Sequence, residues 1–367
     1  MAARPYSALF VTHDVGYYGA SRSLQALLRE YESKRVELAV NRRVFGTNDV
    51  PEIRARFGPH VQRVYELPLP FARCFKGKPL PSWRLAMRNI VSTLMRSRTH
   101  AFISRLQPDF IHLNSLVLHP LVRADLPFIV HVREIHDGAD RHAYRSLCRA
   151  RGVIFIDEAS KAPFAHLPVP SVILNNPIDM RGGDPEKSAQ LRNALGGAGK
   201  TVFGVLGQIN QNKGTAFIIR SFLEARADDA LLLIVGEGEP TYVEHCRRLA
   251  QGNANVSFQG FVSDVATIYG AIDFVLRGEA YPCVGRTIYE GLYAGCAAIV
   301  PGVDGRGLFD YERYSERLFF YEPRNQAQLS ECFRRLARRK PQRQPAGSNV
   351  AQFVEGFDRF VAQVLET

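Results

Sequence analysis

The sequence of 367 residues predicts an α/β protein made of two doubly wound domains, each built on a parallel sheet. Three observations lead to this class. Short apolar, β-rich runs alternate with helical patterns, the runs fall into two series, and a Gly-rich polar stretch separates the series. Continuous apolar runs of this length are typical of parallel strands that are covered on both faces.

The predicted strands lie in two series, and a helix is expected from about Ser21, after the first of them. The first series comprises residues 7–12, 36–40, 109–113, 127–132, 152–156 and 171–174. The second series comprises residues 201–207, 231–236, 256–260, 273–276 and 297–300. Ligands of doubly wound sheets bind beyond the carboxyl ends of the strands, so we expect binding residues in the turns after these runs, in a cleft between the domains.

The Gly-rich stretch at 180–200, "MRGGDPEKSAQLRNALGGAGK", is interpreted as a linker with room for one short helix. The predicted domains are therefore residues 1–178 and residues 179–349. Residues 350–367 carry apolar side chains at helical spacing and predict a terminal helix that could pack back on the first domain.

The composition is that of a globular protein, with 46% hydrophobic and 23% charged residues. No apolar run is long enough to cross a bilayer, and the first run ends in His13 and Asp14, as a buried strand does and a signal peptide does not. The six cysteines show no CxxC and no metal spacing, which indicates reduced thiols in the cytoplasm and predicts no metal site. The net charge of +11 favours phosphate-bearing partners: nucleic acid, anionic lipid or nucleotide-linked substrates.

The stretch "GQINQNKGTAFIIRSF" (207–222) follows a predicted strand and opens a helix near Gly214. A helix N-terminus preceded by Lys213 suits a diphosphate, because free N–H groups and an ammonium group both attract phosphate oxygens. The alternative is an ordinary strand–loop–helix connection with a surface lysine. The Gly-Glu-Gly at 236–238 resembles half of a dinucleotide motif but lacks its third glycine.

The stretch "GEAYPCVGRTIYEG" (278–291) contains a predicted helix start at Gly285, Arg286 and Thr287. The first-turn N–H groups of this helix could meet the same phosphates, and Glu290, one turn further on, could accept hydrogen bonds from a ribose diol. The alternative is that Glu290 is an exposed helix residue and that Arg286 is solvated.

Two stretches of the first domain carry polar groups at predicted strand ends. Gly19 lies in a small-residue loop, "YYGASRSLQALL" (17–28), where the backbone can approach a ligand, although a tight turn explains it as well. His131, Arg133, Glu134 and His136 lie at the end of a predicted strand and together offer acid, base and anion-binding groups. A structural ion pair between Arg133 and Glu134 is the alternative.

Residues 73–105 contain eight Lys and Arg residues and no acid. From Trp83 on, apolar residues recur near helical spacing. A basic amphipathic helix with an aromatic anchor is typical of binding to an anionic membrane surface. The alternative is an ordinary domain helix whose apolar stripe lies in the core.

The order and spacing of these stretches resemble glycosyltransferase family 4, whose members have the GT-B fold. The second domain carries the resemblance most clearly, and both domains contribute segments: 207–214, 231–239, 255–276 and 285–302, and more loosely 17–24, 107–115, 126–134 and 173–179. The resemblance implies two Rossmann-like domains that face each other across a cleft, a UDP- or GDP-sugar as co-substrate with no further cofactor, and metal-independent transfer with retention. In agreement with this, the sequence has no Asp-x-Asp motif.

The resemblance also implies a donor-binding set of residues. Lys213 matches the family's diphosphate-binding lysine, residues 285–287 match its phosphate loop, and Glu290 matches its ribose-binding glutamate. Backbone groups near Phe261 and Val262 would select the base. The full set is Gly19, Gln208, Lys213, Gly214, Phe261, Val262, Gly285, Arg286, Thr287 and Glu290.

Three positions depart from the family pattern. Gln208 stands where the family often has an arginine, and Arg286 could substitute for it. Arg133 stands where the family often has a histidine. The sugar-contacting glutamate should lie eight positions before Glu290, at Pro282, so Glu279 fills that role only if the loop bulges. The implied catalytic candidates are Lys213, Arg133, Glu134, His131 and Glu279.

These expectations together describe a glycosyltransferase that transfers a sugar from a nucleotide-sugar to a lipid-linked or polysaccharide acceptor, with bacterial polysaccharide assembly as the setting by analogy. Its place would be the cytoplasm or the inner face of the cell membrane, through residues 73–105. A nucleotide-sugar 2-epimerase and a non-catalytic GT-B partner subunit remain as alternatives. Nucleic acid is not expected, because no recognition module and no basic–aromatic interleaving is present.

Overall fold

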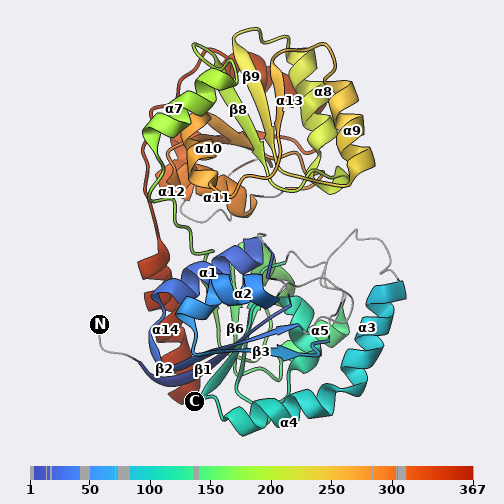
Figure 1. The fold of residues 1–367 in the computed structure, drawn as a ribbon, viewed down its shortest axis with the longest axis vertical. Helices are drawn as coiled ribbons and strands as arrows, with labels where there is room; N and C mark the ends of the chain where they lie inside the picture. Colours follow the sequence, from blue (N-terminus) through green and yellow to red (C-terminus); the bar gives the residue numbers. More distant parts are fainter. Residues whose placement is uncertain are drawn as a thin grey trace. The chain divides into compact units, whose positions relative to one another are not determined.

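The computed structural model describes residues 4–13, 15–16, 19–41, 50–70, 72, 83–134, 140–282, 284–302, 304 and 311–366. The chain divides into two compact units, each with its own parallel sheet (Figure 1). Unit 1 comprises residues 1–177 and 349–367, and unit 2 comprises residues 178–348. The prediction of two α/β domains with parallel sheets is confirmed.

Unit 1 contains a seven-stranded sheet in the order β3-β2-β1-β4-β5-β6-β7. All its strand pairs are parallel. The strands are β1 Arg4–Thr12, β2 Ser33–Asn41, β3 Arg63–Leu67, β4 Phe110–Leu113, β5 Phe128–Val132, β6 Gly152–Phe155 and β7 Ser171–Ile173. Strand order reverses between β1 and β4, so the turns after these two strands flank the ligand-binding position of a doubly wound sheet.

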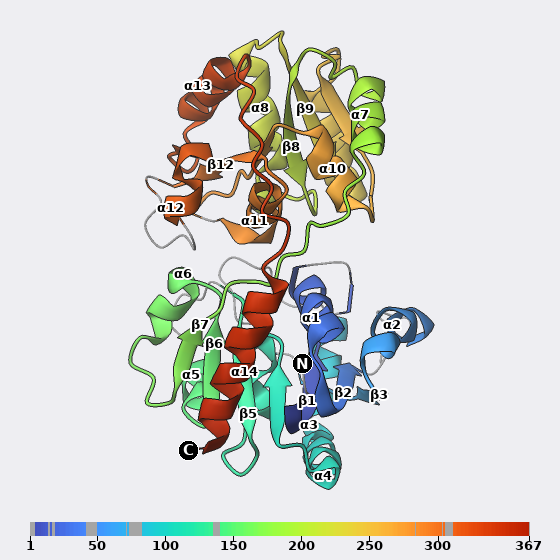
Figure 2. The same ribbon diagram turned by 90° about the vertical axis from the view of Figure 1, so that its left-hand side faces the viewer.

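Helices cover both faces of the unit 1 sheet. They are α1 Gly19–Glu30, α2 Val50–Phe57, α3 Trp83–Leu94, α4 Arg96–Leu106, α5 Arg141–Leu147, α6 Glu158–Lys161 and α14 Val350–Glu366, with the 3₁₀ turns η1 Gly58–His60, η2 Leu116–Leu121 and η3 Ala162–Phe164. One core cluster joins α1, α2 and α14 to the sheet, and a second joins α4, η2 and α5 to its other face. Figure 2 shows α14 lying along the strands of unit 1.

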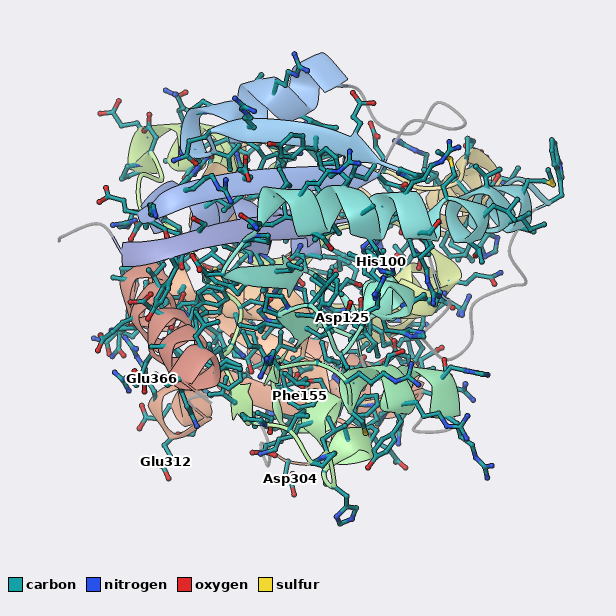
Figure 3. All side chains as sticks on the ribbon, turned by 90° about the horizontal axis from the view of Figure 1, so that it is seen from below. His100, Asp125, Phe155, Asp304, Glu312 and Glu366 are labelled. Carbon is teal, nitrogen blue, oxygen red and sulfur yellow. The ribbon has the colours of Figure 1, made fainter. Side chains whose placement is uncertain are left out.

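A side chain of α4 contacts the last residue of η2. The Nε2 atom of His100 lies 2.9 Å from the carbonyl oxygen of Leu121. Figure 3 labels His100 and Asp125 in the view from below, and Figure 1 shows α3 leading into α4.

Unit 2 contains a six-stranded sheet in the order β10-β9-β8-β11-β12-β13, again parallel throughout. The strands are β8 Thr201–Leu206, β9 Ala230–Val235, β10 Val256–Gln259, β11 Phe274–Leu276, β12 Ala297–Pro301 and β13 Leu318–Tyr321. Strand order reverses between β8 and β11. The turns after these two strands therefore meet at the ligand-binding position of this sheet.

The unit 2 sheet is also covered on both faces. Its helices are α7 Pro185–Ala194, α8 Thr215–Ala225, α9 Pro240–Leu249, α10 Val265–Ala271, α11 Gly285–Tyr293, α12 Tyr311–Tyr314 and α13 Gln326–Leu336, with the 3₁₀ turns η4 Gln211–Lys213 and η5 Ser315–Arg317. Helices α8, α9 and α13 share one core cluster with the sheet, and α10 and α11 share the other.

The interpretation of residues 180–200 as a linker is wrong, because this stretch is an integral part of unit 2. Helix α7 is capped by Asp184 and packs against α10, where the Ser188 hydroxyl donates to the Thr267 carbonyl at 3.1 Å. Arg192 forms an ion pair of 2.7 Å with Asp273. Its exposed charges and flanking glycines give the stretch the composition of a linker, but its polar side chains are used in tertiary contacts.

Among the described residues, no helix combines the length and the apolar character that crossing a membrane requires.

Candidate active site

The turn after β8 places Lys213 at the position where strand order reverses in unit 2. Gln208 is exposed at the end of this strand. Asn210 caps the short turn η4, because its side chain accepts a hydrogen bond of 2.9 Å from the Lys213 backbone N–H. This cap fixes the turn just before α8 begins. Its residues belong to the polar loop that was predicted from the sequence.

Two glycines bring this turn against the end of β11. A Cβ atom on Gly214 would lie 1.8 Å from the carbonyl oxygen of Gly278, and the φ of Gly214 is +67°. Both the backbone conformation and the close approach therefore require glycine at position 214. The contact places Lys213 beside Glu279, although the two residues lie far apart in the sequence.

Glu279 lies at the centre of a cationic cluster. Its side chain is 1% exposed, and its Oε1 lies 3.1 Å from the Nζ of Lys213. Arg277 approaches the same carboxylate, with Nε 3.0 Å from both oxygens and Nη2 in contact with Oε1. Burial alone would raise the pKa of Glu279, but the charges and hydrogen bonds of Arg277, followed by the charge of Lys213, hold this pKa below its ordinary value.

The N-terminus of α11 faces the same cluster. Gly285 begins the helix with a φ of +67°, and a Cβ atom there would lie 2.0 Å from Nη1 of Arg277. The same nitrogen lies 3.4 Å from the hydroxyl of Thr287. The guanidinium group of Arg277 therefore covers the first turn of α11, where N–H groups without an intrahelical partner and the positive end of the helix dipole attract anions.

Glu290 lies one turn into α11 and is 1% exposed. Its Oε1 accepts a hydrogen bond of 2.7 Å from Nε of Arg286, and its Oε2 lies 3.1 Å from the hydroxyl of Tyr269 on α10. The alternative in which Glu290 is exposed and Arg286 is solvated is wrong, since the Arg286 side chain is only 10% exposed.

The remaining predicted residues of unit 2 follow β10, at the same edge of the sheet. The Phe261 side chain is 51% exposed, and Val262 is half-buried against the core cluster that contains α10 and α11. An exposed aromatic ring beside a half-buried apolar residue offers a flat apolar surface of the kind on which a nucleobase stacks.

The chemistry of the unit 2 site is therefore that of an anion site with a buried counter-ion. Cations, free helix N–H groups and an apolar platform lie along the carboxyl edge of one sheet. Within the described part of the chain, the side chains of His, Cys, Asp and Glu form no group of three that could hold a metal ion.

In unit 1, Arg133 follows β5 and is held by several groups at the carboxyl edge of the sheet. Its Nε lies 3.1 Å from Oδ1 of Asn114, and its Nη1 donates to Oδ1 of Asn176 at 2.6 Å. Asn114 also donates to the Ala20 carbonyl at 3.0 Å, which connects the cluster to the start of α1, next to the exposed Gly19.

The other two candidates of this strand differ in accessibility. Glu134 is half-buried, and its carboxylate accepts hydrogen bonds from the Ser115 hydroxyl and, at 3.1 Å, from the N–H of Leu116. His131 is 0% exposed, and its Nδ1 lies 3.2 Å from Nη2 of Arg133. The neighbouring His136 lies outside the described residues. His131 can therefore orient Arg133 but does not reach the surface of unit 1.

Sequence reasoning missed several of the residues in these clusters. Arg277 was part of no predicted motif, and neither Asn114 nor Asn176 was a candidate. Their position after a strand was a signal that could have identified them. Each of the three residues comes directly or shortly after a strand, and the carboxyl edge of a parallel sheet is where ligand-binding groups lie.

A separate surface lies on α3 of unit 1. Trp83, Met87, Ile90 and Leu94 are 68%, 45%, 53% and 76% exposed. Their spacing of four, three and four residues places them on one face of the helix. The alternative of an apolar stripe in the core is wrong for these four residues, whereas Ile103 on α4 is fully buried.

Comparison with known proteins finds a family that resembles the unit 2 region. Residues 200–339 match the family described as glycosyl transferases group 1. The glycogen synthase of Vibrio parahaemolyticus is 26% identical over 160 residues, which are 41% of this chain and 33% of that protein. The chain thus spans about a third of the length of the curated relatives it matches.

Solved structures match along nearly the whole chain. Anabaena HepE in complex with UDP and glucose superposes with a TM-score of 0.68 at 18% identity, covering 97% of this chain and 99% of HepE. Sucrose-phosphate synthase of Thermosynechococcus elongatus gives a TM-score of 0.66 at 15% identity, covering 97% of each chain. The chain therefore has the GT-B fold of these proteins, and its residues 200–339 are similar to the domain of glycosyl transferases group 1.

Proposed function

We propose that the protein transfers a sugar from a nucleoside-diphosphate sugar, with UDP as the nucleotide, to a carbohydrate or lipid-linked acceptor. The observation that carries this proposal is the convergence of Lys213, Arg277 and the N-terminus of α11 at the position where strand order reverses in unit 2. The match of this region to glycosyltransferase group 1, and the UDP and UDP-glucose bound by HepE, support a nucleotide-sugar donor.

The donor would occupy the carboxyl edge of the unit 2 sheet. Lys213 and the first N–H groups of α11, from Gly285 to Thr287, bind the diphosphate. Glu290 accepts hydrogen bonds from the ribose diol. Because Arg286 now occupies one oxygen of Glu290, donor binding would turn Arg286 toward the phosphates and leave that oxygen to the ribose.

The base would bind next to the backbone of residues 208–214 and 261–262. Phe261 supplies an exposed ring for stacking, and the backbone groups of the two turns supply the hydrogen bonds that select uracil. Gln208, which stands where the resembled family often has an arginine, supplies a neutral amide and no charge for the phosphates.

Negative charge develops on the departing diphosphate as the sugar leaves. Preorganised cations and N–H groups stabilise this charge more strongly than that of the bound donor, so they supply most of the rate enhancement. We propose retention of configuration, with the diphosphate itself assisting deprotonation of the acceptor, and no metal requirement. Arg133 and Glu134 of unit 1 are proposed to bind the acceptor, with His131 orienting Arg133.

Calorimetry with UDP, GDP and their glucose and mannose derivatives tests the donor. We expect UDP to bind and Lys213→Ala to weaken it by about 10-fold or more, because a charge-assisted contact to phosphate is lost. Failure of the wild-type protein to bind any nucleoside diphosphate would refute the proposal. Turnover in the presence of EDTA tests the absence of a metal requirement. The anomeric configuration of the product, determined by NMR, tests retention.

Product analysis separates the alternatives. A 2-epimerase would convert the nucleotide-sugar without an acceptor, and mass spectrometry with isotope exchange would show solvent deuterium in the sugar. A non-catalytic subunit would bind UDP and transfer nothing to any lipid-linked or polysaccharide acceptor.

We further propose that α3 brings unit 1 to an anionic membrane surface, where a lipid-linked acceptor is found. The exposed apolar face of α3 is flanked by Arg96 and Arg98, both exposed, within a segment of eight basic residues and no acid. Apolar side chains can enter the acyl boundary while the basic side chains contact lipid phosphates.

Trp83 is the single tryptophan of the chain and reports on this contact. We expect its fluorescence to shift to the blue with vesicles that contain phosphatidylglycerol and not with pure phosphatidylcholine. Ile90→Asp should abolish the shift, whereas Phe261→Asp, which changes a side chain of similar exposure in unit 2, should leave it unchanged. Equal shifts with both kinds of vesicle would contradict the electrostatic part of the proposal.

A further inference from the structure

We propose that Glu279 is a positioning residue that orients two phosphate-binding cations, Lys213 and Arg277, and that it does not contact the donor sugar. Arg277 becomes a second cation for the diphosphate. The inference rests on the proposed function, since it states how the donor site of unit 2 is held together.

The exposed fraction of the side chains increases from Glu279 to Arg277 and then to Lys213, which indicates that a ligand from solvent approaches from the side of Lys213. The Glu279 side chain is 1% exposed, that of Arg277 is 10% exposed and that of Lys213 is 43% exposed. A ligand entering from solvent meets the ammonium group of Lys213 first. A sugar hydroxyl would reach Glu279 only by displacing two cations, whereas a ribose reaches Glu290 when the single cation Arg286 turns away.

The hydrogen bonds of Glu279 are also directed at these cations. Arg277 donates to both carboxylate oxygens from Nε, each at 3.0 Å, and Lys213 approaches Oε1 at 3.1 Å. One carboxylate contacts both cations. A diphosphate bound beside Lys213 and Arg277 would bring further negative charge to the same two side chains.

Arg277 extends the cluster to the start of α11. Its Nη1 lies 3.4 Å from Oγ1 of Thr287 and occupies the space that a Cβ atom on Gly285 would need. The planar guanidinium group is therefore fixed at one end by Glu279 and points its other edge at the first turn of the helix. A fork of N–H donors in this position matches the geometry of phosphate oxygens.

The ionised state of Glu279 agrees with this role. Although burial raises its pKa, Arg277 and then Lys213 lower it further than burial raises it, so the carboxylate stays charged at neutral pH. A carboxylate that must remain ionised to hold two cations is a counter-ion and not a proton donor.

Calorimetry with three ligands, uridine, UDP and UDP-glucose, separates positioning from sugar contact. For Glu279→Gln we expect the affinities for UDP and UDP-glucose to fall by the same factor, about 10-fold or more, and the affinity for uridine to stay unchanged. Arg277→Gln should show the same pattern, and Arg277→Lys should recover part of the loss. Glu312→Gln, a change of an exposed carboxylate in unit 2, serves as the matched control.

The sign of the Glu279→Gln effect is itself informative. Removal of a negative charge beside a phosphate site would by simple Coulomb attraction tighten UDP binding. Loss of positioning does the opposite. Tighter UDP binding, or weaker binding of UDP-glucose with unchanged UDP binding, would overturn the inference.

Further controls keep this test independent of folding and of the proposed function. If Glu279→Gln fails to fold by circular dichroism, Arg277→Lys and Arg277→Gln carry the test, since unchanged UDP binding in both also overturns the inference. If the wild-type protein binds no nucleoside diphosphate, the proposed function fails and the inference fails with it. If the wild-type protein binds UDP and the variants lose only UDP-glucose, the proposed function stands and the inference alone fails.

Discussion

Two buried histidines should make unit 1 sensitive to mild acid. His112 on β4 and His131 on β5 are both 0% exposed, and Nε2 of His112 lies 3.2 Å from Nδ1 of His131. The aromatic rings of Phe10, Phe353 and Phe357 pack against them. Burial lowers the pKa of each histidine well below 6.5, and the charge of Arg133 lowers both further.

The direction of the effect follows from proton binding. Both histidines are neutral in the folded protein, whereas in the unfolded chain each binds a proton as the pH falls through 6.5. The unfolded state then binds more protons, so the free energy of unfolding is unaffected well above pH 6.5 and decreases below it. The limiting slope is about 1.4 kcal/mol per pH unit for each histidine, which sets an upper limit of about 2 kcal/mol for each between about pH 7.5 and about pH 5.

Hydrogen exchange measured by mass spectrometry can follow this loss in each unit separately. Peptides from β4, β5 and α14 report the opening of unit 1, and peptides from β8 and β9 report unit 2 as an internal reference. After correction for the intrinsic exchange rates, the opening free energy of unit 1 should fall on acidification, by at most about 4 kcal/mol from this pair.

The double variant His112→Asn, His131→Asn removes both titrating groups and should flatten the slope by up to about 2.7 kcal/mol per pH unit. The same slope in the variant and the wild-type protein would refute the reasoning, because the acid sensitivity would then come from other groups. A Cε1 proton signal of His112 or His131 that titrates near 6.5 in the folded protein would refute it as well.

Three further predictions concern stability and reactivity. Asp273→Asn breaks the 2.7 Å ion pair with Arg192 and weakens the hydrogen bond from the Val202 N–H. The unfolding free energy of unit 2, measured by urea titration, should therefore fall by about 3 kcal/mol, and unchanged stability would contradict the role of this pair. Phe357→Ala empties a fully buried ring position and should destabilise unit 1 by about 3–5 kcal/mol in the same assay, with no change in the opening of unit 2. Burial raises the pKa of the Cys296 thiol to about 11. Iodoacetamide at about pH 8 should therefore modify Cys296 only after unfolding, and rapid labelling of Cys296 in the native protein would disprove this.

The interior strands could be predicted from the sequence because each is a short apolar run bounded by polar turns. The two strands that were missed, β3 and β13, lie at the edges of their sheets. Strand β3 reads RVYEL, with charged residues at two of its five positions, and only its last residue is buried. Strand β3 is buried less completely than the interior strands, so its composition differs little from that of a loop. Strand β13, LFFY, is wholly apolar, and the edge strands β7 and β10 were predicted, so an edge position alone does not explain which strands were missed.

The candidate site divides in a similar way. Lys213, Gly285 and Glu290 stand in strand–loop–helix patterns that can be recognised from one stretch of sequence. Arg277 lies close in sequence to its contacts Glu279 and Thr287, but it follows a strand without any pattern that marks it. Tyr269 cannot be recognised because the carboxylate it contacts, that of Glu290, belongs to another stretch. Only the fold brings β11 beside the turn after β8, and α10 beside α11.

The position of Glu279 shows why its role could not be decided by counting residues along the chain. Counted back from Glu290, Glu279 needs a bulge to reach the position of Pro282, and its role then depends on how the loop is drawn. In the structure, Glu279 is fixed from the other side: β11 ends at Leu276, and the contact between Gly214 and Gly278 holds the next residue in the interior. Pro282 lies exposed further along the loop. A carboxylate whose place is set by a strand end and two cations has a structural reason to be there without any sugar, and for this reason UDP alone is the decisive ligand for Glu279→Gln.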